Sequence, residues 1–473
     1  MKKDTLKSLY ARLKSANSYP EWLSLAEEID ALNDHLAWQS HIPDDGVYAL
    51  LDVHVKRINT LIASRQWLKL VDFLRESLYR MVAELNSHRL YSLALTGPKH
   101  VVESYLSAVE CALDCICETE IKELSVSQKL AVFTQAETNF GRPALMLSGG
   151  GTFGIYHVGV VKALLEQGVL PEVISGTSMG SIAAGILAVN DDQALYELFK
   201  KPEERHYRPL KRLPWRDMFS AKALLNEAQL NECILANMGN LTFAEAYRKT
   251  GREISISVSS NRPGQKPRIL NYQTAPDVLI SSASRASCSV PGLFPPCKLR
   301  AKQANGNIVD YMPSEYWVDG SFASDIPQQR IGRLHNVNYF IVSQANPHVL
   351  PFVSHRQKSG LAAVAKDLAV SSLVSQSRTL LKVAQRRLHR EPWRSWLDHG
   401  SLILGQEYLG DINLHPDFPA QWFLKFMKNP TIDEIHYLLK TGERTTWPYL
   451  KMIENQTRIS KKLRACVTHL QTQ

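Results

Sequence analysis

The sequence predicts an α/β protein with a mainly parallel central sheet, preceded by an all-α N-terminal domain and followed by C-terminal helices. Before about residue 140 the apolar residues recur every three or four positions, as they do in amphipathic helices. After residue 143 short aliphatic runs are each followed by glycines and then by a helical stretch, which is typical of parallel sheets. We therefore expect domains at residues 1–140 and 141–350 and a mainly helical, basic extension at 351–473.

The N-terminal region is predicted to be entirely helical. Its period is clearest in the segments WLSLAEEIDAL, YALLDVHVKRINTLI and WLKLVDFLRESLYRMVAEL. Further helices are expected over residues 98–121 and 127–139, the second with Ser127 as its N-cap. No fixed period links these segments, which argues against a solenoid.

The strands expected in the α/β region are short apolar or β-branched runs. They lie at residues 144–147, 173–175, 253–259, 268–271, 317–318 and 338–343. Between residues 200 and 219 the segment KKPEERHYRPLKRLPWRDMF combines prolines with many charges, so it predicts a surface loop.

Composition narrows the class of protein. Of the 473 residues, 44% are hydrophobic and 21% are charged, the mixture of an ordinary folded chain. The net charge of +9 favours an anionic partner, but no zinc knuckle or aromatic-lined motif points to nucleic acid. The seven cysteines are scattered without a CxxC pair, which fits a reducing compartment.

Targeting signals are also not predicted. Asp4, Lys7 and Arg12 interrupt any apolar core that a secretory signal would need. The two longest uncharged stretches, 144–161 and 173–189, contain Gly, Ser or Thr runs typical of buried strands and tight turns. We therefore expect a cytoplasmic protein without a signal peptide or a transmembrane helix.

A glycine-rich turn, Ser148-Gly149-Gly150-Gly151-Thr152-Phe153-Gly154, follows the first expected strand directly and precedes a helix. Such a turn presents backbone N–H groups at a helix N-terminus and suits negative charge. It also matches GxGxxG, but a dinucleotide site needs an acidic residue at the end of the next strand, and that strand ends in glycine. A dinucleotide cofactor is therefore disfavoured.

The second motif is Gly176-Thr177-Ser178-Met179-Gly180, a GxSxG sequence between a strand and the helix SIAAGILAV. In this context the pattern is typical of a nucleophile elbow, in which Ser178 is the nucleophile and Gly176 and Gly180 permit the tight turn. The alternative is a strand-to-helix turn whose small residues serve only close packing. If Ser178 is a nucleophile, the glycine-loop amides are placed to stabilise an oxyanion.

A serine nucleophile needs a base, and the sequence offers two arrangements. One uses a histidine late in the chain, for which the candidates are His335, His348, His389, His399 and His415. The other uses Asp319 in Trp317-Val318-Asp319-Gly320-Ser321, whose burial would raise the pKa of the carboxyl and its basicity. An isolated Asp-Gly pair is also an ordinary turn.

The motifs SGGGTFG, GTSMG and DGS, in this order, closely resemble those of the patatin-like phospholipase family. The resemblance implies a patatin-like three-layer fold and a Ser–Asp dyad without histidine, in which Ser178 is the nucleophile and Asp319 its base. It also implies oxyanion amides at Gly149, Gly150 and Gly151, and neither metal nor cofactor. The chain departs from the usual pattern at Phe153 and Ser321, which are not catalytic positions.

Further segments are similar to the storage-lipid triacylglycerol lipases that carry an N-terminal helical domain. They include LYSLALTGPKHVVESYL, TFAEAYRKTGREISISVSS, SRASCSVPGLFPP and QEYLGDINLHP. The subgroup usually has a histidine before the glycine in Thr96-Gly97-Pro98-Lys99. The resemblance implies hydrolysis of lipid carboxylic esters, with triacylglycerol, phospholipid and lysophospholipid all open as substrates. The alternative is an inactive lipid-binding or scaffold protein that keeps the fold.

Three further features bear on lipid binding. The basic residues of 378–394 predict an amphipathic helix, which either packs on the protein or contacts a membrane or lipid-droplet surface; a second basic stretch, 458–464, could act with it. The PGLFPP run either packs in the core or lines an acyl channel. His157, in the helix after the glycine loop, is expected to pack rather than to catalyse.

Overall fold

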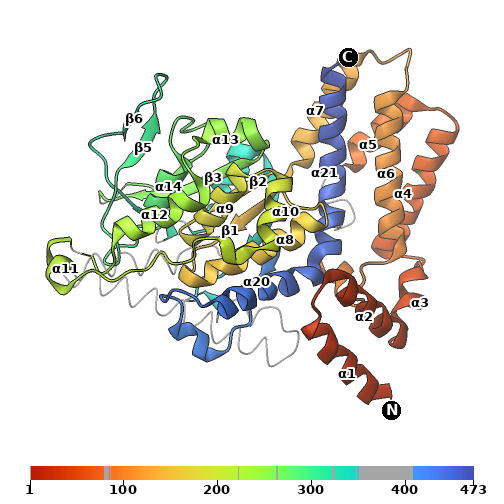
Figure 1. Cartoon of the computed structure of the whole chain (residues 1–473). Coiled ribbons are helices and arrows are strands. Elements are labelled where there is room, and N and C mark those ends of the chain that lie inside the picture. Colours follow the sequence, from red (N-terminus) through yellow and green to blue (C-terminus); the bar gives the residue numbers. More distant parts are fainter. Residues whose placement is uncertain are drawn as a thin grey trace, which may run out of the picture.

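In the computed structural model, N-terminal helices lie beside a sheet-containing part, and the C-terminal helices lie against both (Figure 1). The structure describes residues 2–78, 85, 87–221, 223–262, 265–321, 325–347, 349–350 and 409–473. The basic segment 378–394 therefore lies outside the described residues.

The N-terminal region is helical, as predicted. Its elements are α1 (Lys2–Ser15), α2 (Tyr19–Leu32), α3 (His35–Ser40), α4 (Gly46–Ala63), α5 (Trp67–Ser77), η2 (His88–Tyr91), α6 (His100–Glu118) and α7 (Val126–Phe140). The expected N-cap at Ser127 was wrong. Ser125 caps α7 instead, because Gln128 stands three residues after it and the two form a reciprocal capping box.

The central sheet contains every strand that the sequence predicts. Its strands are β1 (Arg142–Leu147), β2 (Val173–Gly176), β3 (Glu253–Ser260), β4 (Arg268–Leu270), β7 (Trp317–Asp319), β8 (Val337–Ser343) and β9 (Ile412–Leu414). They follow the order β4-β3-β2-β1-β8-β9, and β7 also pairs with β3. All pairings are parallel except those of β4 and β7 with β3.

Two strand features were not predicted. β9 lies in the region expected to be mainly helical, and its three residues are too few to show a period. β5 (Leu299–Lys302) and β6 (Ile308–Tyr311) form a separate two-stranded hairpin.

Helices cover both faces of the sheet, which explains why strand side chains are apolar on both sides. Leu145 and Leu147 of β1 belong to the large core with α8 (Tyr156–Glu166), α9 (Met179–Val189) and α14 (Ile280–Ser287). Ala144 and Met146 point to the opposite face, where Ile331 of α16 (Gln328–His335) packs. The predicted α/β class with a mainly parallel sheet is therefore confirmed.

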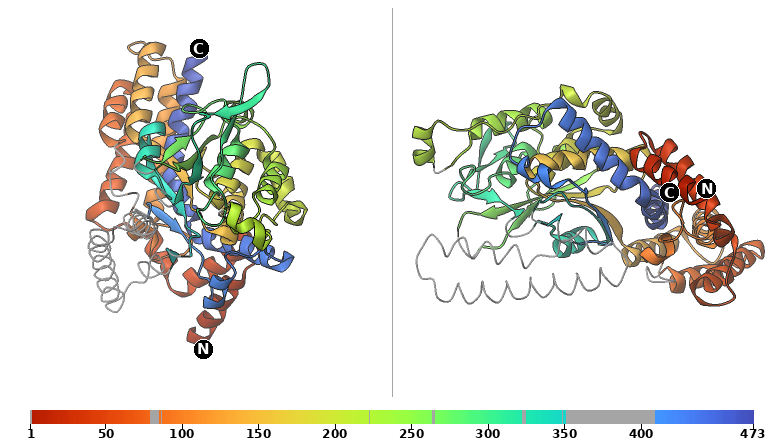
Figure 2. Two further views of the ribbon diagram at one scale, coloured as in Figure 1. Left: turned by 90° about the vertical axis from the view of Figure 1, so that its left-hand side faces the viewer. Right: turned by 90° about the horizontal axis from the view of Figure 1, so that it is seen from below.

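The C-terminal helices join the two parts of the molecule. α20 (Ile432–Thr446) packs on α8, and the close approach depends on Gly159 and Gly442, at each of which a Cβ would meet a backbone carbonyl of the other helix. After η6 (Trp447–Tyr449), α21 (Leu450–Gln471) rises between the sheet and the N-terminal helices (Figures 1 and 2). Ile459 and Leu463 of α21 belong to the same apolar cluster as α4, α5 and α6.

The basic stretch at residues 458–464 does not form a free cationic face. Arg458 pairs with Glu103 and Glu110 of α6, and Lys462 pairs with Asp114 of the same helix. Arg464 pairs with Glu172 beside the sheet. The expectation that this stretch assists lipid binding is therefore not supported, because its charges hold α21 against neighbouring elements.

The predicted surface loop after residue 200 is only partly irregular. It contains η4 (Pro202–Glu204) and leads into α11 (Trp215–Ala221). The remaining helices of the α/β part are η3 (Gly151–Ile155), α10 (Asp192–Lys200), α12 (Glu227–Met238) and α13 (Phe243–Thr250), and η5 (Ala420–Leu424) precedes α20.

Candidate active site

Ser178 occupies the sharp turn between β2 and α9. Its φ of +50° is a conformation that non-glycine residues rarely adopt, so the turn is strained at the serine itself. Gly176 and Gly180 are needed for space: a Cβ on Gly180 would lie 2.5 Å from the carbonyl oxygen of Ser148. The GxSxG sequence therefore forms a strand–turn–helix elbow, with Ser178 only 9% exposed.

The side chain of Ser287 in α14 fixes the turn at Ser178 through two hydrogen bonds. The amide of Ser178 donates to Ser287 Oγ at 2.8 Å, and Ser287 Oγ donates to the carbonyl oxygen of Ser257 in β3 at 2.7 Å. Sequence reasoning missed Ser287, because a serine in a serine-rich helix gives no signal of its tertiary partner.

Asp319 ends β7 and is completely buried. Its amide donates to the carbonyl oxygen of Ser289 at 3.0 Å, and its Oδ1 accepts the amide of Ser321 at 2.7 Å. Burial raises the pKa of Asp319 to about 6, while hydrogen bonds from Ser321 and the Ser178 side chain act in the opposite direction. The structure thus brings Ser178 and Asp319 together, although 141 residues separate them in the sequence.

One carboxylate oxygen of Asp319 is available to the serine. Oδ2 of Asp319 is buried, and within the described residues it makes no hydrogen bond of normal geometry. The Ser178 side chain is nevertheless close enough to lower the pKa of the carboxyl. A buried carboxylate oxygen normally has a donor, because its desolvation is costly. Oδ2 is therefore the acceptor left for the Ser178 hydroxyl.

The glycine loop lies directly against the elbow. A Cβ on Gly149 would lie 3.3 Å from Cβ of Ser178, and Gly150 and Gly151 adopt positive φ angles of 154° and 55°. Within the described residues no group accepts a hydrogen bond from the amide of Gly150 or of Gly151. These two amides are therefore free beside Ser178.

The amide of Gly149, which the sequence analysis placed among the oxyanion donors, already has a hydrogen-bond acceptor. It donates to Oδ1 of Asp325 at 2.9 Å, so in this structure it is not free for a reacting carbonyl. Sequence reasoning included Gly149 among the free donors because a glycine run gives no indication of which amides already have partners.

Asp325 is a second buried carboxylate that the sequence analysis did not identify. Its Oδ2 accepts from Nδ2 of Asn346 at 2.5 Å, and its carbonyl oxygen accepts from Oγ1 of Thr177 at 2.8 Å. Burial, with a smaller contribution from the nearby Asp319 carboxylate, raises the pKa of Asp325 to about 7, while the hydrogen bonds from Gly149 and Asn346 act in the opposite direction. Asp325 thus links the glycine loop, the elbow and the end of β8.

His157 also holds the glycine loop. With its proton on Nε2 it donates to the carbonyl oxygen of Ser148 at 3.0 Å, and its Nδ1 accepts from Oγ of Ser343 at 2.7 Å. Burial lowers the pKa of His157 to about 4, so the ring is neutral near pH 7. These contacts match the packing role expected for it.

The other histidine candidates do not join this site in the described residues. His335 hydrogen-bonds Glu253 at 2.7 Å and contacts Ser255. His348, His389 and His399 lie outside the described residues. His415 is half-buried just after β9, and it does not line the cavity onto which Ser178 opens.

Ser178 lines an apolar cavity, which we call the reaction cavity; its empty space of about 570 Å³ includes the solvent at its open side. Its walls include Gly151, Leu293, Phe294 and Met427. In the PGLFPP run Phe294 is buried in the core and also lines this cavity, while its role in an acyl channel stays a prediction. Burial raises the pKa of the Cys288 thiol in the same wall, which keeps it protonated and unreactive.

The described residues contain no group of three or more His, Cys, Asp or Glu side chains arranged to hold a metal ion. None of the helices in the described ranges combines the length and the apolar character needed to cross a bilayer. All seven cysteines are free thiols.

Comparisons with known proteins agree with the motifs. The family model described as patatin-like phospholipase matches residues 145–329, and a domain of unknown function (DUF3336) matches residues 1–138. A patatin-like phospholipase domain-containing protein of Pyricularia oryzae is 33% identical over 388 residues, which cover 79% of this chain and 49% of that protein. The chain thus spans about half the length of this relative.

Two other relatives match over nearly the whole chain. Triacylglycerol lipase ptl3 of Schizosaccharomyces pombe is 30% identical over 478 residues, 97% of each chain. Triacylglycerol lipase SDP1L of Arabidopsis thaliana is 30% identical over 488 residues, 97% of this chain and 58% of its own. The elbow, the glycine loop and this full-length similarity together show that the chain belongs to the patatin-like phospholipase family.

Proposed function

We propose that the protein is a serine hydrolase of lipid carboxylic esters, in which Ser178 is the nucleophile and Asp319 its base. The observation that carries the proposal is a completely buried Asp319 whose carboxyl lies close enough to the strained Ser178 for the serine side chain to lower its pKa, and whose Oδ2 has no other hydrogen-bond donor within the described residues. A carboxyl whose pKa lies near 6 is a better base than an ordinary aspartate and is still ionised near pH 7.

Acylation follows from this geometry. Oγ of Ser178 bonds to the ester carbonyl carbon while its proton passes to Oδ2 of Asp319, and the carbonyl electron pair moves onto oxygen. The free amides of Gly150 and Gly151 stabilise this oxyanion, each by roughly 3 kcal/mol for a well-placed donor. When the intermediate collapses, the alcohol leaves with the proton held by Asp319.

Deacylation reverses the roles. Water attacks the acyl carbon, Asp319 takes one of its protons, and the same amides hold the second oxyanion. Collapse releases the fatty acid and returns the proton to Oγ of Ser178. No step requires a metal ion or an organic cofactor.

Triacylglycerol is the substrate favoured by the relatives named triacylglycerol lipase. The apolar walls of the reaction cavity suit the chains of any lipid ester. A panel of triolein, phosphatidylcholine and lysophosphatidylcholine therefore decides the preference, with triolein expected to be hydrolysed fastest.

Labelling by a fluorophosphonate tests the enzyme against the alternative of an inactive lipid-binding scaffold. We expect the natural chain to be labelled and Ser178→Ala to remain unlabelled. Absence of labelling in a folded natural chain would support the scaffold.

We further propose that the protein works at a lipid surface, and that the mouth of the reaction cavity is the docking face. Leu424 is 78% exposed, and Phe426 and Ile432 are also exposed. The segment around Leu210 is joined to the segment that carries these residues, because the side chain of Asn429 exchanges two hydrogen bonds with the backbone of Leu210.

Exposed Arg208 and Lys211 flank Leu210, and exposed Lys428 precedes Asn429. Exposed apolar residues with cations on the same segments suit a surface of anionic phospholipid. In a flotation assay with vesicles of phosphatidylserine and phosphatidylcholine, Leu424→Glu combined with Phe426→Glu should lose most of the binding. The control is Leu50→Glu, which replaces an exposed leucine on α4 and should bind the vesicles normally. Equal binding by the natural chain, the double variant and Leu50→Glu would rule out this face as the docking surface.

A further inference from the structure

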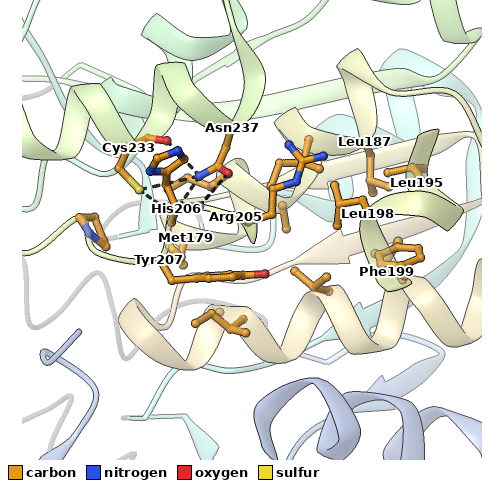
Figure 3. Close-up of a pocket in the computed structure, with 18 residues that line it drawn as sticks. Met179, Leu187, Leu195, Leu198, Phe199, Arg205, His206, Tyr207, Cys233 and Asn237 are labelled. Carbon is orange, nitrogen blue, oxygen red and sulfur yellow. Dashed lines mark hydrogen bonds between the residues drawn. The ribbon is translucent and has the colours of Figure 1, made fainter. Parts of the chain in front are cut away.

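A second apolar cavity adjoins the reaction cavity, and its empty space of about 700 Å³ includes the solvent at its open side. Figure 3 shows the side chains that line it. We call it the inner cavity. Ile155, Met179, Ile182, Tyr207 and Pro209 line both cavities. Because Met179 follows Ser178 in the chain, the inner cavity begins one residue from the proposed nucleophile.

The inner cavity runs from this shared wall to an aliphatic end. Figure 3 shows Met179 and Tyr207 toward one end and Leu195, Leu198 and Phe199 of α10 toward the other. Ile186 and Leu187 of α9 also line the cavity, and Figure 3 shows Leu187 beside Leu195 at the aliphatic end. Burial raises the pKa of Tyr207 to about 12, as expected for a hydroxyl in poorly hydrated surroundings.

The segment 205–210 covers the inner cavity and is tied down by α12. Nδ2 of Asn237 donates to the carbonyl oxygen of His206 at 2.9 Å, and Oδ1 of Asn237 accepts the His206 amide at 3.3 Å. Sγ of Cys233 donates to the same carbonyl at 2.9 Å. The backbone of the cover is thus held by the buried side chains of Asn237 and Cys233 in α12 and does not depend on the cover's own charged side chains.

The two sides of this cover differ in polarity. Its outer side borders a more polar cleft of about 800 Å³, lined by Glu203, Arg208, Gln229 and Glu232. Of the charged residues in and just before this segment, Glu203 and Arg208 line that cleft, and Arg205 lines both the cleft and the inner cavity. The inner side closes an apolar space instead.

We propose that the inner cavity binds the fatty acyl chain of the ester that Ser178 cleaves, with Met179 and Tyr207 at its entrance. This inference rests on the proposed function. A flexible, unbranched apolar chain fits this space, which starts beside the nucleophile and ends at apolar side chains of α10. The polar residues that line it, Arg205, His206 and Asn237, belong to the cover and to α12, and a glycerol or phosphate group would lose its hydration at the α10 end. Methionine suits the entrance, because its side chain adapts to a passing ligand.

The cavity should make hydrolysis depend on the length of the cleaved chain. Each methylene buried in an apolar wall favours binding by roughly three- to fourfold. Kinetics with p-nitrophenyl palmitate and p-nitrophenyl butyrate measure this dependence as the ratio of their kcat/KM values. Ile186 is a half-buried wall residue, so Ile186→Trp fills the cavity, and we expect it to lower the palmitate-to-butyrate ratio at least tenfold.

Ile308→Trp is the matched control. It makes the same change on the exposed β5–β6 hairpin, away from both cavities and from the proposed docking face, and should leave the ratio within twofold of the natural value. An unchanged ratio in folded Ile186→Trp would overturn the inference. Failure of the natural chain to cleave the butyrate ester would instead count against the proposed function itself.

A covalent probe tests the same inference without any substitution. A long-chain fluorophosphonate with a diazirine at its far end should react at Ser178 and, on illumination, cross-link to α10 near Leu195, Leu198 or Phe199. Cross-links at Leu424 or Phe426 after normal reaction at Ser178 would overturn the inference. No reaction at Ser178 would contradict the proposed function.

Discussion

The carboxylate of Asp325 accepts a hydrogen bond from the amide of Gly149 at 2.9 Å. This contact fixes the first peptide of the glycine loop and leaves the amides of Gly150 and Gly151 as the free donors beside Ser178. Asp325 therefore acts on the proposed oxyanion site through the backbone, without lining the reaction cavity.

Asp325→Ala should lower kcat about 10- to 100-fold with little change in KM, since a displaced loop weakens binding of the oxyanion more than binding of the substrate. Asp325→Asn keeps an oxygen that can accept from Gly149 and should recover part of the loss. Steady-state kinetics and the rate of fluorophosphonate inactivation measure both effects. Equal losses in the two variants would show that the hydrogen bond is not the cause.

Asp319→Asn should reduce kcat by at least a thousandfold, because an amide cannot take the proton of Ser178. The variant should stay folded and unfold at a higher temperature near pH 7, since it no longer buries a charge. Hydrolysis of a short ester and thermal unfolding are the two measurements. Asp310→Asn, on the β5–β6 hairpin, serves as the control, and retained activity in Asp319→Asn would point to a histidine base.

Hydrolysis should depend on pH through Asp319. Because its pKa in the folded protein is about 6, kcat/KM should be constant above pH 7 and fall about tenfold per pH unit well below 6. A rate profile with a short soluble ester measures this. A profile that keeps its full rate at pH 4.5 would contradict a base with a raised pKa.

Folding stability should show the opposite trend with pH. Asp319 and Asp325 have raised pKa values when folded, about 6 and 7, so the folded chain binds more protons than the unfolded chain between about pH 4 and 7. Their contribution is largest below the unfolded pKa and is lost as the pH rises through 6 to 7. Unfolding midpoints between pH 5 and 8 should fall less in Asp319→Asn than in the natural chain.

Gly151→Ala should abolish most activity. Its positive φ and the nearby carbonyl oxygen of Phe426 leave no place for a Cβ, so the loop must shift and move the amide of residue 151. Gly306→Ala also carries a positive φ, but on an open hairpin turn where nothing lies within 4 Å, and it should keep full activity. Ester hydrolysis of both variants separates backbone strain from displacement of the amide.

Arg458→Met should destabilise the contact between α21 and α6, because it leaves Glu103 and Glu110 without their half-buried partner. We expect a lower unfolding temperature but unchanged vesicle binding, since these charges face the protein. Thermal unfolding and flotation test this pair of outcomes. If folded Arg458→Met lost vesicle binding, the hypothesis that residues 458–464 contribute to lipid binding would be supported again.

Much of the fold could be predicted because it depends on local patterns. The helical period before residue 140 and the glycine-terminated runs after 143 identified the helices and the main strands. The turn at Ser178 was equally predictable, because GxSxG between a strand and a helix permits few conformations. β9 could not be predicted, since three residues carry no period and are strands only through pairing with β8.

The sequence by itself determined the chain's family, its α/β class and the local turns that carry Ser178, Asp319 and the glycine loop. Only the tertiary structure decided which amides stay free, because Asp325 reaches Gly149 across 176 residues of chain. The tertiary structure also decided the pKa of Asp319, because that pKa depends on burial. It placed the charged segment 205–210 over an apolar cavity, which the composition of the segment did not indicate. Local sequence restricts backbone angles, whereas burial and hydrogen-bond partners depend on segments that meet only when the whole chain is packed.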